Sequence, residues 1–464
     1  MKNELKKKID ERFDYGFDFD ETAGTIPLQK RKPFYRKPVW IAALSLIVVG
    51  GISLGVGLPL ALKKEEKPIS TEIRLNQVVR PFNTARVELE ESYLFAVKRF
   101  TSDFYAQLNR TDSLVFSPLS IMTCYSMLLE GCAGESERQL SEALHIADLE
   151  SFREETRKML ENTSLNTGYS LLEIAQSYWI DTSFSASVRP SYLDCLSENY
   201  YAEAYQGNLS SDAMKASLAD WINEKTRDFL DVKAEDFKKY GGVLWLLNTV
   251  YLKSAWAEGF DEEDDVSGTF ENLDQSKTEE VIYMDKTVRA EYYSDETITL
   301  ASLPLTDGLK VHFLLPNRGV SASDVLGDRQ SVDLLLNQQN LSKTYDGVHF
   351  RLPQVKVRSS IDLAEVWEQL GVVDIFDPNN ADFGKMVDLK RSSDNFYVTQ
   401  SKHEAGIEFT HSGIEAAAYT IIEEGSTSTE PIDRAIEFFM DRPFLYTITD
   451  PSGVPLFFGN VSQM

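Results

Sequence analysis

A segment near the C-terminus, residues 413–434, reads GIEAAAYTIIEEGSTSTEPIDR and decides how the rest of the chain is interpreted. A glycine precedes a run of small residues with strand periodicity, and an acidic stretch rich in Ser and Thr follows without a hydrophobic stripe. A long segment of this kind inside a compact domain is usually functional, and its tip is of the type that proteases cleave. Its first half can join a sheet, because small side chains pass between existing strands with little clash. We therefore expect an exposed, cleavable loop whose beginning can become a strand.

The chain around this loop predicts a single α+β domain. Helical patterns come first and strand-like runs fill the last third, an order that is typical of the α+β class. A short apolar strand ends at Ser117, and proline at the next position begins a helix. Further helices are expected at 136–160 and 213–230, and strands at 171–180, 243–252, 298–304, 309–315 and 348–357. A length of 464 residues suits two to four domains, but no linker or repeat divides residues 88–464.

Composition and motifs exclude several classes of function. The net charge of −26 argues against a nucleic-acid partner, since phosphate binding needs a basic surface. Three cysteines, Cys124, Cys132 and Cys195, are too few for a disulfide framework and are expected to be buried free thiols. The sequence contains no nucleophile elbow, phosphate-binding loop or dinucleotide fingerprint. The acidic run 261–265 suits a solvated loop better than a calcium site. We expect no enzymatic activity, no cofactor and no metal.

The charge is divided unevenly by an apolar stretch. Residues 38–62 contain no charged side chain, and as a helix they would rise about 37 Å, enough to cross a bilayer. Five basic residues lie just before the stretch, which by the positive-inside rule predicts a cytoplasmic N-terminus and an extracellular C-terminal part. The tail 1–37 carries a net charge of +3 and residues 65–464 carry −31. The predicted organisation is a cytoplasmic tail (1–37), an uncleaved transmembrane helix (38–62), a linker (63–87) and one large domain (88–464).

Residues 88–464 closely resemble a serpin, a member of the serine protease inhibitor family. The resemblance rests on blocks that occur in the family's order and spacing: Phe116-Ser117-Pro118 with Ser120-Ile121, Gly131, Gly134, Asn248, Lys253, Trp256, Phe260, Leu352-Pro353, Leu370-Gly371, Phe376-Asp377, Ala381-Asp382-Phe383, His403, the hinge Gly413 to Ala418, Arg442-Pro443-Phe444 and Phe457-Phe458-Gly459. A single basic-flanked anchor and free cysteines would suit a bacterial membrane protein that faces outward.

The resemblance implies a fold of three sheets and about nine helices with an exposed reactive loop. In inhibitory members a serine or cysteine protease attacks the loop and becomes acylated, and the cleaved loop then inserts into the central sheet and distorts the enzyme. By similarity, Ser117, Ser120, Asn248 and His403 would form a polar cluster beneath the opening sheet, and Trp256 would lie where insertion begins. The same residues would also serve as satisfied core groups.

The hinge pattern permits insertion. In an inserted strand alternate side chains face the core, which places Ile414, Ala416, Ala418 and Thr420 inward and leaves Glu415, Ala417, Tyr419 and Ile421 outward. Ile414 departs from the Thr or Ser usual in the family, and His411 and Ser412 replace a common acidic pair. These departures concern control of the hinge rather than the fold.

The scissile bond is expected between Thr427 and Ser428, because inhibitors of this family usually place the cleaved residue fourteen after the hinge glycine. Ser426 remains an alternative cleaved residue, as does Ser428. Small residues here suit elastase-like or subtilisin-like proteases, and Glu423 and Glu424 favour a target that is basic near its substrate groove. We expect a monomer whose partners are an extracellular protease and, through residues 38–62, the membrane. The alternative is a non-inhibitory serpin that acts as a surface binding or carrier protein.

Overall fold

The computed structural model describes residues 43–51, 73–81, 86–163, 165–238, 242–338, 341–343, 347–388, 396–414 and 435–464. The chain divides into two compact units, Met1–Val39 and Trp40–Met464, and all described residues lie in the second. Within them are nine α-helices: α2 (Glu91–Ala106), α3 (Pro118–Leu129), α4 (Gly134–Ala143), α5 (Leu149–Asn162), α6 (Pro190–Asn199), α7 (Asp212–Lys225), α8 (Ala322–Gly327), α9 (Arg329–Asn337) and α10 (Leu363–Gln369).

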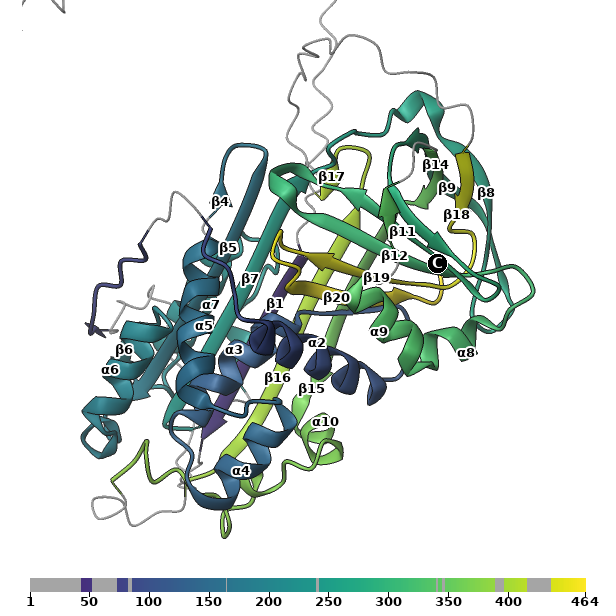
Figure 1. Cartoon of the computed structure of the whole chain (residues 1–464). Coiled ribbons are helices and arrows are strands. Elements are labelled where there is room, and N and C mark those ends of the chain that lie inside the picture. The colour runs from purple at the N-terminus through teal and green to yellow at the C-terminus, as the bar shows by residue number, and fades with distance from the viewer. Residues whose placement is uncertain are drawn as a thin grey trace, which may run out of the picture. The chain divides into compact units, whose positions relative to one another are not determined.

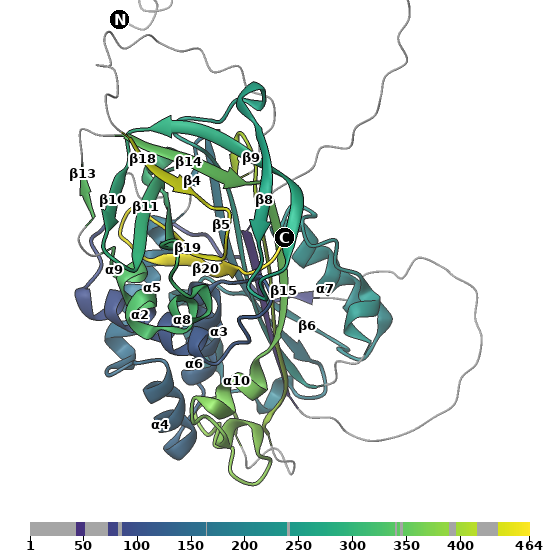
Figure 2. The same cartoon turned by 90° about the vertical axis from the view of Figure 1, so that its right-hand side faces the viewer.

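The strands of this unit form three sheets (Figures 1 and 2). The large sheet has the order β15 (Val355–Asp362), β16 (Val398–Phe409), β1 (Ala43–Gly51), β7 (Leu244–Ala255), β5 (Ser170–Asp181), β6 (Glu203–Gly207) and β2 (Ile73–Arg74), with β17 (Gly413–Ile414) beside β7 and β4 (Leu165–Asn166) beside β5. A second sheet has the order β13 (Ser342–Lys343), β10 (Glu291–Ser294), β11 (Ile298–Pro304), β12 (Lys310–Pro316), β19 (Phe444–Thr449), β20 (Pro455–Val461) and β3 (Leu114–Phe116). The third contains β18 (Ala435–Phe439), β14 (Gly347–Pro353), β9 (Lys277–Val288) and β8 (Val266–Glu271).

The large sheet is covered on both faces, because successive side chains of a strand point to opposite sides. On β7, Leu246 and Leu252 join the main core, which also contains residues of α3. Trp245 and Leu247 instead pack in a separate cluster with residues of α7. A strand buried on both faces shows a continuous apolar run, and β7 begins LWLL.

The structure differs from the sequence-based prediction at residues 38–62. The part of this stretch that is described, Ala43–Gly51, is the strand β1 in the middle of the large sheet and not a helix. A continuous apolar run with β-branched residues suits a central strand as well as a helix, so periodicity alone does not separate the two. Nowhere in the described part of the chain is there a helix both long and apolar enough to cross a membrane. The rest of 38–62 lies outside the described residues.

The described part of the predicted linker is attached to the edge of the large sheet. β2 pairs antiparallel with β6, and the Leu75 N–H donates to the carbonyl of Ala204 at 2.8 Å. Further along, Arg80 Nη2 donates to the carbonyl of Ile174 at 2.6 Å, and burial lowers the pKa of Arg80 to about 10. Residues 73–81 therefore follow the sheet edge instead of hanging free.

Candidate functional site: the hinge and the sheet beneath it

The predicted hinge begins in a tight turn at the end of β16. The N–H of Thr410 donates to the carbonyl of Gly413 and the N–H of Gly413 donates to the carbonyl of Thr410, both at 3.2 Å. Gly413 has a φ of +126°, and a Cβ added there would lie 2.4 Å from the carbonyl oxygen of Ser254 and 2.6 Å from the Cα of Ala255. Because both atoms belong to the backbone of β7, only glycine fits at this point of the turn.

Immediately after the turn, the hinge pairs with the large sheet. Gly413 lies opposite Ala255 and Ile414 opposite Ser254, in an antiparallel arrangement. Ile414 is fully buried, as expected for the first inward-facing position of an inserted strand. Residues 415–434 lie outside the described residues, so the hinge residues Glu415, Ala416, Ala417, Ala418 and Thr420 and the expected scissile residues Thr427 and Ser428 have no described structure.

Trp256 holds the turn in place from the end of β7. Its indole Nε1–H donates to the carbonyl of Thr410 at 2.7 Å, and its backbone N–H donates to the carbonyl of Ser412 at 3.2 Å. The ring is buried and stacks against Phe409, with 6.3 Å between the ring centroids. The family resemblance implies that Trp256 lies where loop insertion begins, and the structure brings it into direct contact with the backbone of the hinge turn.

The four polar residues expected beneath the sheet lie together and are fully buried. Ser117 caps α3: the Ser120 N–H donates to Ser117 Oγ at 3.2 Å. The Ser117 N–H donates to His403 Nε2 on β16 at 3.1 Å, and Ser120 Oγ donates to Asn248 Oδ1 on β7 at 2.5 Å. The first turn of α3 thus contacts both strands that flank β1. Because the first turn of α3 is hydrogen-bonded to both strands, β7 and β16 cannot move apart unless at least one of these hydrogen bonds breaks.

Three contacts near this site were not predicted from the sequence. Tyr125 of α3 hydrogen-bonds through its hydroxyl to Ser401 of β16, which adds a second link between these elements. His411 Nε2 lies 2.8 Å from Asp265 Oδ1, so the acidic run 261–265 contacts the hinge turn. Thr410 donates its hydroxyl to the Gly413 carbonyl at 3.0 Å. The first two contacts join residues far apart in the sequence, where no local pattern can reveal them.

The free thiols largely match expectation. Cys124 and Cys132 are fully buried, and burial raises the pKa of each thiol well above its usual range. Cys195 is half-buried, and the same effect raises its pKa to about 11. The neutral thiol therefore dominates at all three positions near neutral pH.

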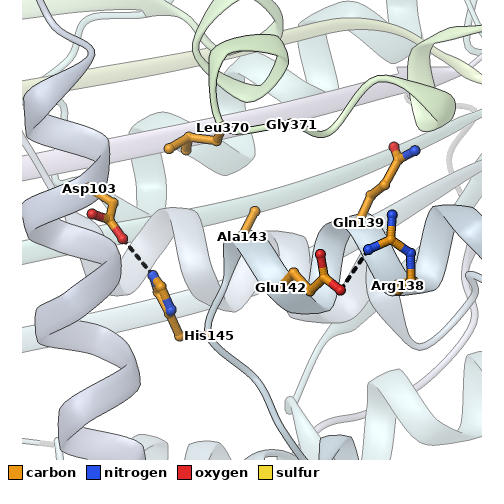
Figure 3. A pocket seen from close by; sticks show the side chains of 8 residues that line it. All are labelled: Asp103, Arg138, Gln139, Glu142, Ala143, His145, Leu370 and Gly371. Carbon is orange, nitrogen blue, oxygen red and sulfur yellow. Dashed lines mark hydrogen bonds and ion pairs between the residues drawn. The ribbon is translucent and has the colours of Figure 1, made fainter.

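A polar pocket of about 220 Å³ lies apart from the hinge, between α2, α4 and the end of α10 (Figure 3). Asp103 lies at one side and pairs with His145, with Oδ2 and Nε2 2.7 Å apart, and with Arg329. Arg138 pairs with Glu142 at the other side, with 2.6 Å between Nη1 and Oε1. The contacts of Asp103 join α2 to His145 and to α9, whereas Arg138 and Glu142 pair within α4; the charged side chains that line the pocket are thus paired with one another.

Comparisons with known proteins show the family to which this chain belongs. The family model described as "Serpin (serine protease inhibitor)" matches residues 95–464. Among curated relatives, Serpin-ZX of Arabidopsis thaliana is 28% identical over 76% of this chain and 93% of its own length. The leukocyte elastase inhibitor of Xenopus laevis is 26% identical over 80% of this chain and 100% of its own length.

Solved structures show the same fold. The native state of tengpin, a thermophilic serpin, has a TM-score of 0.69 at 20% identity and covers 82% of this chain and 97% of its own. Human thyroxine-binding globulin, solved as a complex with thyroxine, has a TM-score of 0.66 at 19% identity, covering 80% of this chain and 99% of its own. The chain belongs to the serpin family. The family is one of protease inhibitors, in agreement with the prediction that the chain is not an enzyme. The curated relatives named here come from a plant and an animal, and another comes from an archaeon, so they give no support to the expected bacterial origin.

Proposed function

We propose that this serpin is a suicide-substrate inhibitor of extracellular serine proteases, and in some cases of cysteine proteases. The observation that carries the proposal is the pairing of Gly413 and Ile414 with β7, with Ile414 fully buried. A cleaved loop that continues from this point needs no new turn to become a strand. The protease, joined by an ester or thioester to the loop, is carried along as the strand forms.

Side-chain alternation supports the same mechanism. In an inserted strand Ala416, Ala418 and Thr420, which are small, would share the face of Ile414, whereas Tyr419 would belong to the opposite face. The larger Ile414 already has a place in the core, so the departure from Thr or Ser at this position does not obstruct the start of insertion. The proposed scissile bond is Thr427–Ser428, which suits elastase-like and subtilisin-like enzymes.

A matched pair of hinge variants tests the proposal. Full-length protein is incubated with an elastase-like or a subtilisin-like protease, and the covalent complex is measured on a denaturing gel, with mass spectrometry of the released peptide to locate the cleaved bond. Ala418→Glu is expected to be cleaved without complex, because insertion would bury a carboxylate. Ala417→Glu, on the outward face, is expected to form as much complex as the unsubstituted chain. Complete cleavage with no complex for any protease tested, both in the unsubstituted chain and in a Val48→Pro chain whose proline disfavours the central strand β1, would refute the proposal.

The second candidate is a non-inhibitory binding or carrier protein. Thyroxine-binding globulin, which was solved as a complex with thyroxine, shares the fold of this chain. Cleavage of the loop separates the two functions, because insertion adds a strand with its buried surface and hydrogen bonds. A large rise in melting temperature after cleavage supports inhibition, whereas an unchanged value supports the carrier.

For location, we propose that residues 38–62 anchor the protein in the cell membrane with the N-terminus in the cytoplasm and residues 88–464 outside. The support is the uncharged stretch itself and its basic flank. Fractionation of cells that express the chain tests the anchor, and protease added to intact cells tests the orientation. Recovery of the intact chain without detergent in the soluble fraction would contradict it.

A further inference from the structure

The strand β1 occupies the centre of the large sheet, between β7 and β16 (Figure 1). It pairs antiparallel with both neighbours: Ile47 lies opposite Asn248 on one side and opposite His403 on the other. These are the two strand residues of the buried polar cluster described above. β1 therefore passes over the first turn of α3, where the sheet must part if it is to accept another strand.

The register shows that β1 and the hinge strand β17 pair with the same edge of β7, one after the other. The hinge pairs Ile414 with Ser254, and β1 begins two residues further along β7, where Ala43 lies opposite Leu252. Both run antiparallel to β7. If the register of the hinge is continued, residue 416 falls opposite Leu252 and residue 423 opposite Trp245. Gly50 of β1 is the residue that lies opposite Trp245.

We infer that residues 43–51 are a built-in occupant of the position that the reactive loop needs, and that they hold the inhibitor in an inactive form. The inference rests on the proposed function, since a place in the sheet matters for inhibition only if the loop must insert. Two strands cannot pair with the same edges of β7 and β16 at once. While β1 is in place, insertion is limited to the two hinge residues that are already paired, and a protease would cleave the loop and leave.

β1 is favoured in this position because it belongs to the same chain as the sheet that it joins. An intramolecular strand acts at the effective concentration set by its tether, so pairing does not depend on protein concentration. The same residues also lie in the proposed membrane anchor, and one segment cannot be in the sheet and in a bilayer together. Whatever draws residues 43–51 out of the sheet therefore shifts the population toward the form that can accept the loop.

Cysteine cross-linking tests the position of β1. Val48 lies opposite Lys402 of β16, and Lys402 has a partly exposed side chain. Directly opposite residues of antiparallel strands have Cα atoms about 4.5–5.5 Å apart, within the range of a disulfide. The full chain with Val48→Cys and Lys402→Cys, in a Cys195→Ser background, is made by cell-free synthesis without lipid or detergent and treated with a mild oxidant.

The matched control carries Leu44→Cys with the same Lys402→Cys. Leu44 lies opposite Gly406, four residues from Lys402, which is about 13 Å along the strand. A cross-link is expected in most of the first protein and not in the control. Circular dichroism confirms that both proteins are folded. A cross-link no more abundant than in the control would overturn the inference.

The locked protein then tests the consequence for inhibition. With the disulfide intact β1 cannot leave the sheet, so an elastase-like protease is expected to cleave the loop with at least tenfold less covalent complex than in the same protein treated with a thiol reductant, in which β1 can exchange out of the sheet during the reaction. Equal complex in the locked and reduced forms would refute the blocking role. If the cross-link forms but neither the reduced form nor a Val48→Pro chain, in which proline disfavours β1, yields complex, the proposed function fails while the occupancy of the sheet by β1 stands.

Discussion

Replacing Gly413 by alanine is expected to destabilise the protein more than any ordinary glycine substitution in a turn. The new Cβ would meet the backbone of Ser254 and Ala255 at 2.4 and 2.6 Å, distances that no side-chain rearrangement can relieve. The turn must therefore move away from β7. That movement breaks the two hydrogen bonds that Trp256, at the end of β7, donates to the carbonyls of Thr410 and Ser412, and it withdraws Ile414 from the core.

The magnitude follows from these losses. Each hydrogen bond contributes about 1 kcal/mol and the buried isoleucine about 1.5–3 kcal/mol. Together they predict a decrease of about 3–5 kcal/mol in the free energy of unfolding. Gly319→Ala is the control: Gly319 has a φ of +86°, and no described atom lies within 4 Å of its Cβ position. It incurs the conformational cost of a positive φ alone, about 1–2 kcal/mol.

Urea denaturation followed by tryptophan fluorescence measures both variants, and Trp256 gives a direct signal because its indole contacts the turn. Limited proteolysis after residue 409 adds a local readout of turn displacement. If Gly413→Ala loses no more stability than Gly319→Ala, the close approach of the hinge to β7 does not exist in solution. The argument that the hinge is already paired with the sheet would then fall.

Three further predictions concern buried groups. Asn248→Ala leaves Ser120 without its acceptor and is expected to cost about 1–3 kcal/mol in urea denaturation, whereas Asn337→Ala, at an exposed helix end, is expected to change stability by less than about 0.5 kcal/mol. Burial lowers the pKa of His312 to about 3, so between about pH 6.5 and pH 3 the unfolded state binds a proton that the folded state does not. As the pH is lowered through this range, the free energy of unfolding is expected to decrease by up to about 1.4 kcal/mol per pH unit. Urea denaturation of His312→Gln should show a smaller decrease over the same range. With a pKa of about 11, Cys195 is expected to react slowly with iodoacetamide at pH 8 and quickly after unfolding, as measured by mass spectrometry; fast labelling of the native protein would contradict the assigned burial.

Much of the fold could be predicted because its strands carry strong local signals. The run expected at 243–252 is β7, and the run at 348–357 covers β14 and the beginning of β15, separated at Gln354. The proline after Ser117 located the start of α3 correctly. The helical pattern expected at 136–160 corresponds to two helices, α4 and α5, because the chain turns at His145, whose φ is positive.

The assignment of β1 and the contacts of α3 could not be predicted from local sequence, because they depend on segments that meet only in the folded chain. Residues 43–51 carry no feature that distinguishes a central strand from a membrane helix, because both need a continuous apolar run. The partners of α3 lie in β7 and β16, far along the chain, so the sequence could name Ser117 and His403 only through family resemblance. The bond between Tyr125 and Ser401 has no local signature at all.

The attachment of residues 73–81 to the sheet edge also limits how far an anchored domain could lie from the membrane. With residues 38–62 in a bilayer, only residues 63–72 separate the membrane from the fixed start of β2, and ten residues span at most about 35 Å. The inhibitor would thus work within roughly one domain diameter of the lipid surface. Its choice of target would be spatial as well as chemical: proteases bound to, or passing close to, the cell that carries it would be captured, and those in the surrounding fluid would be spared.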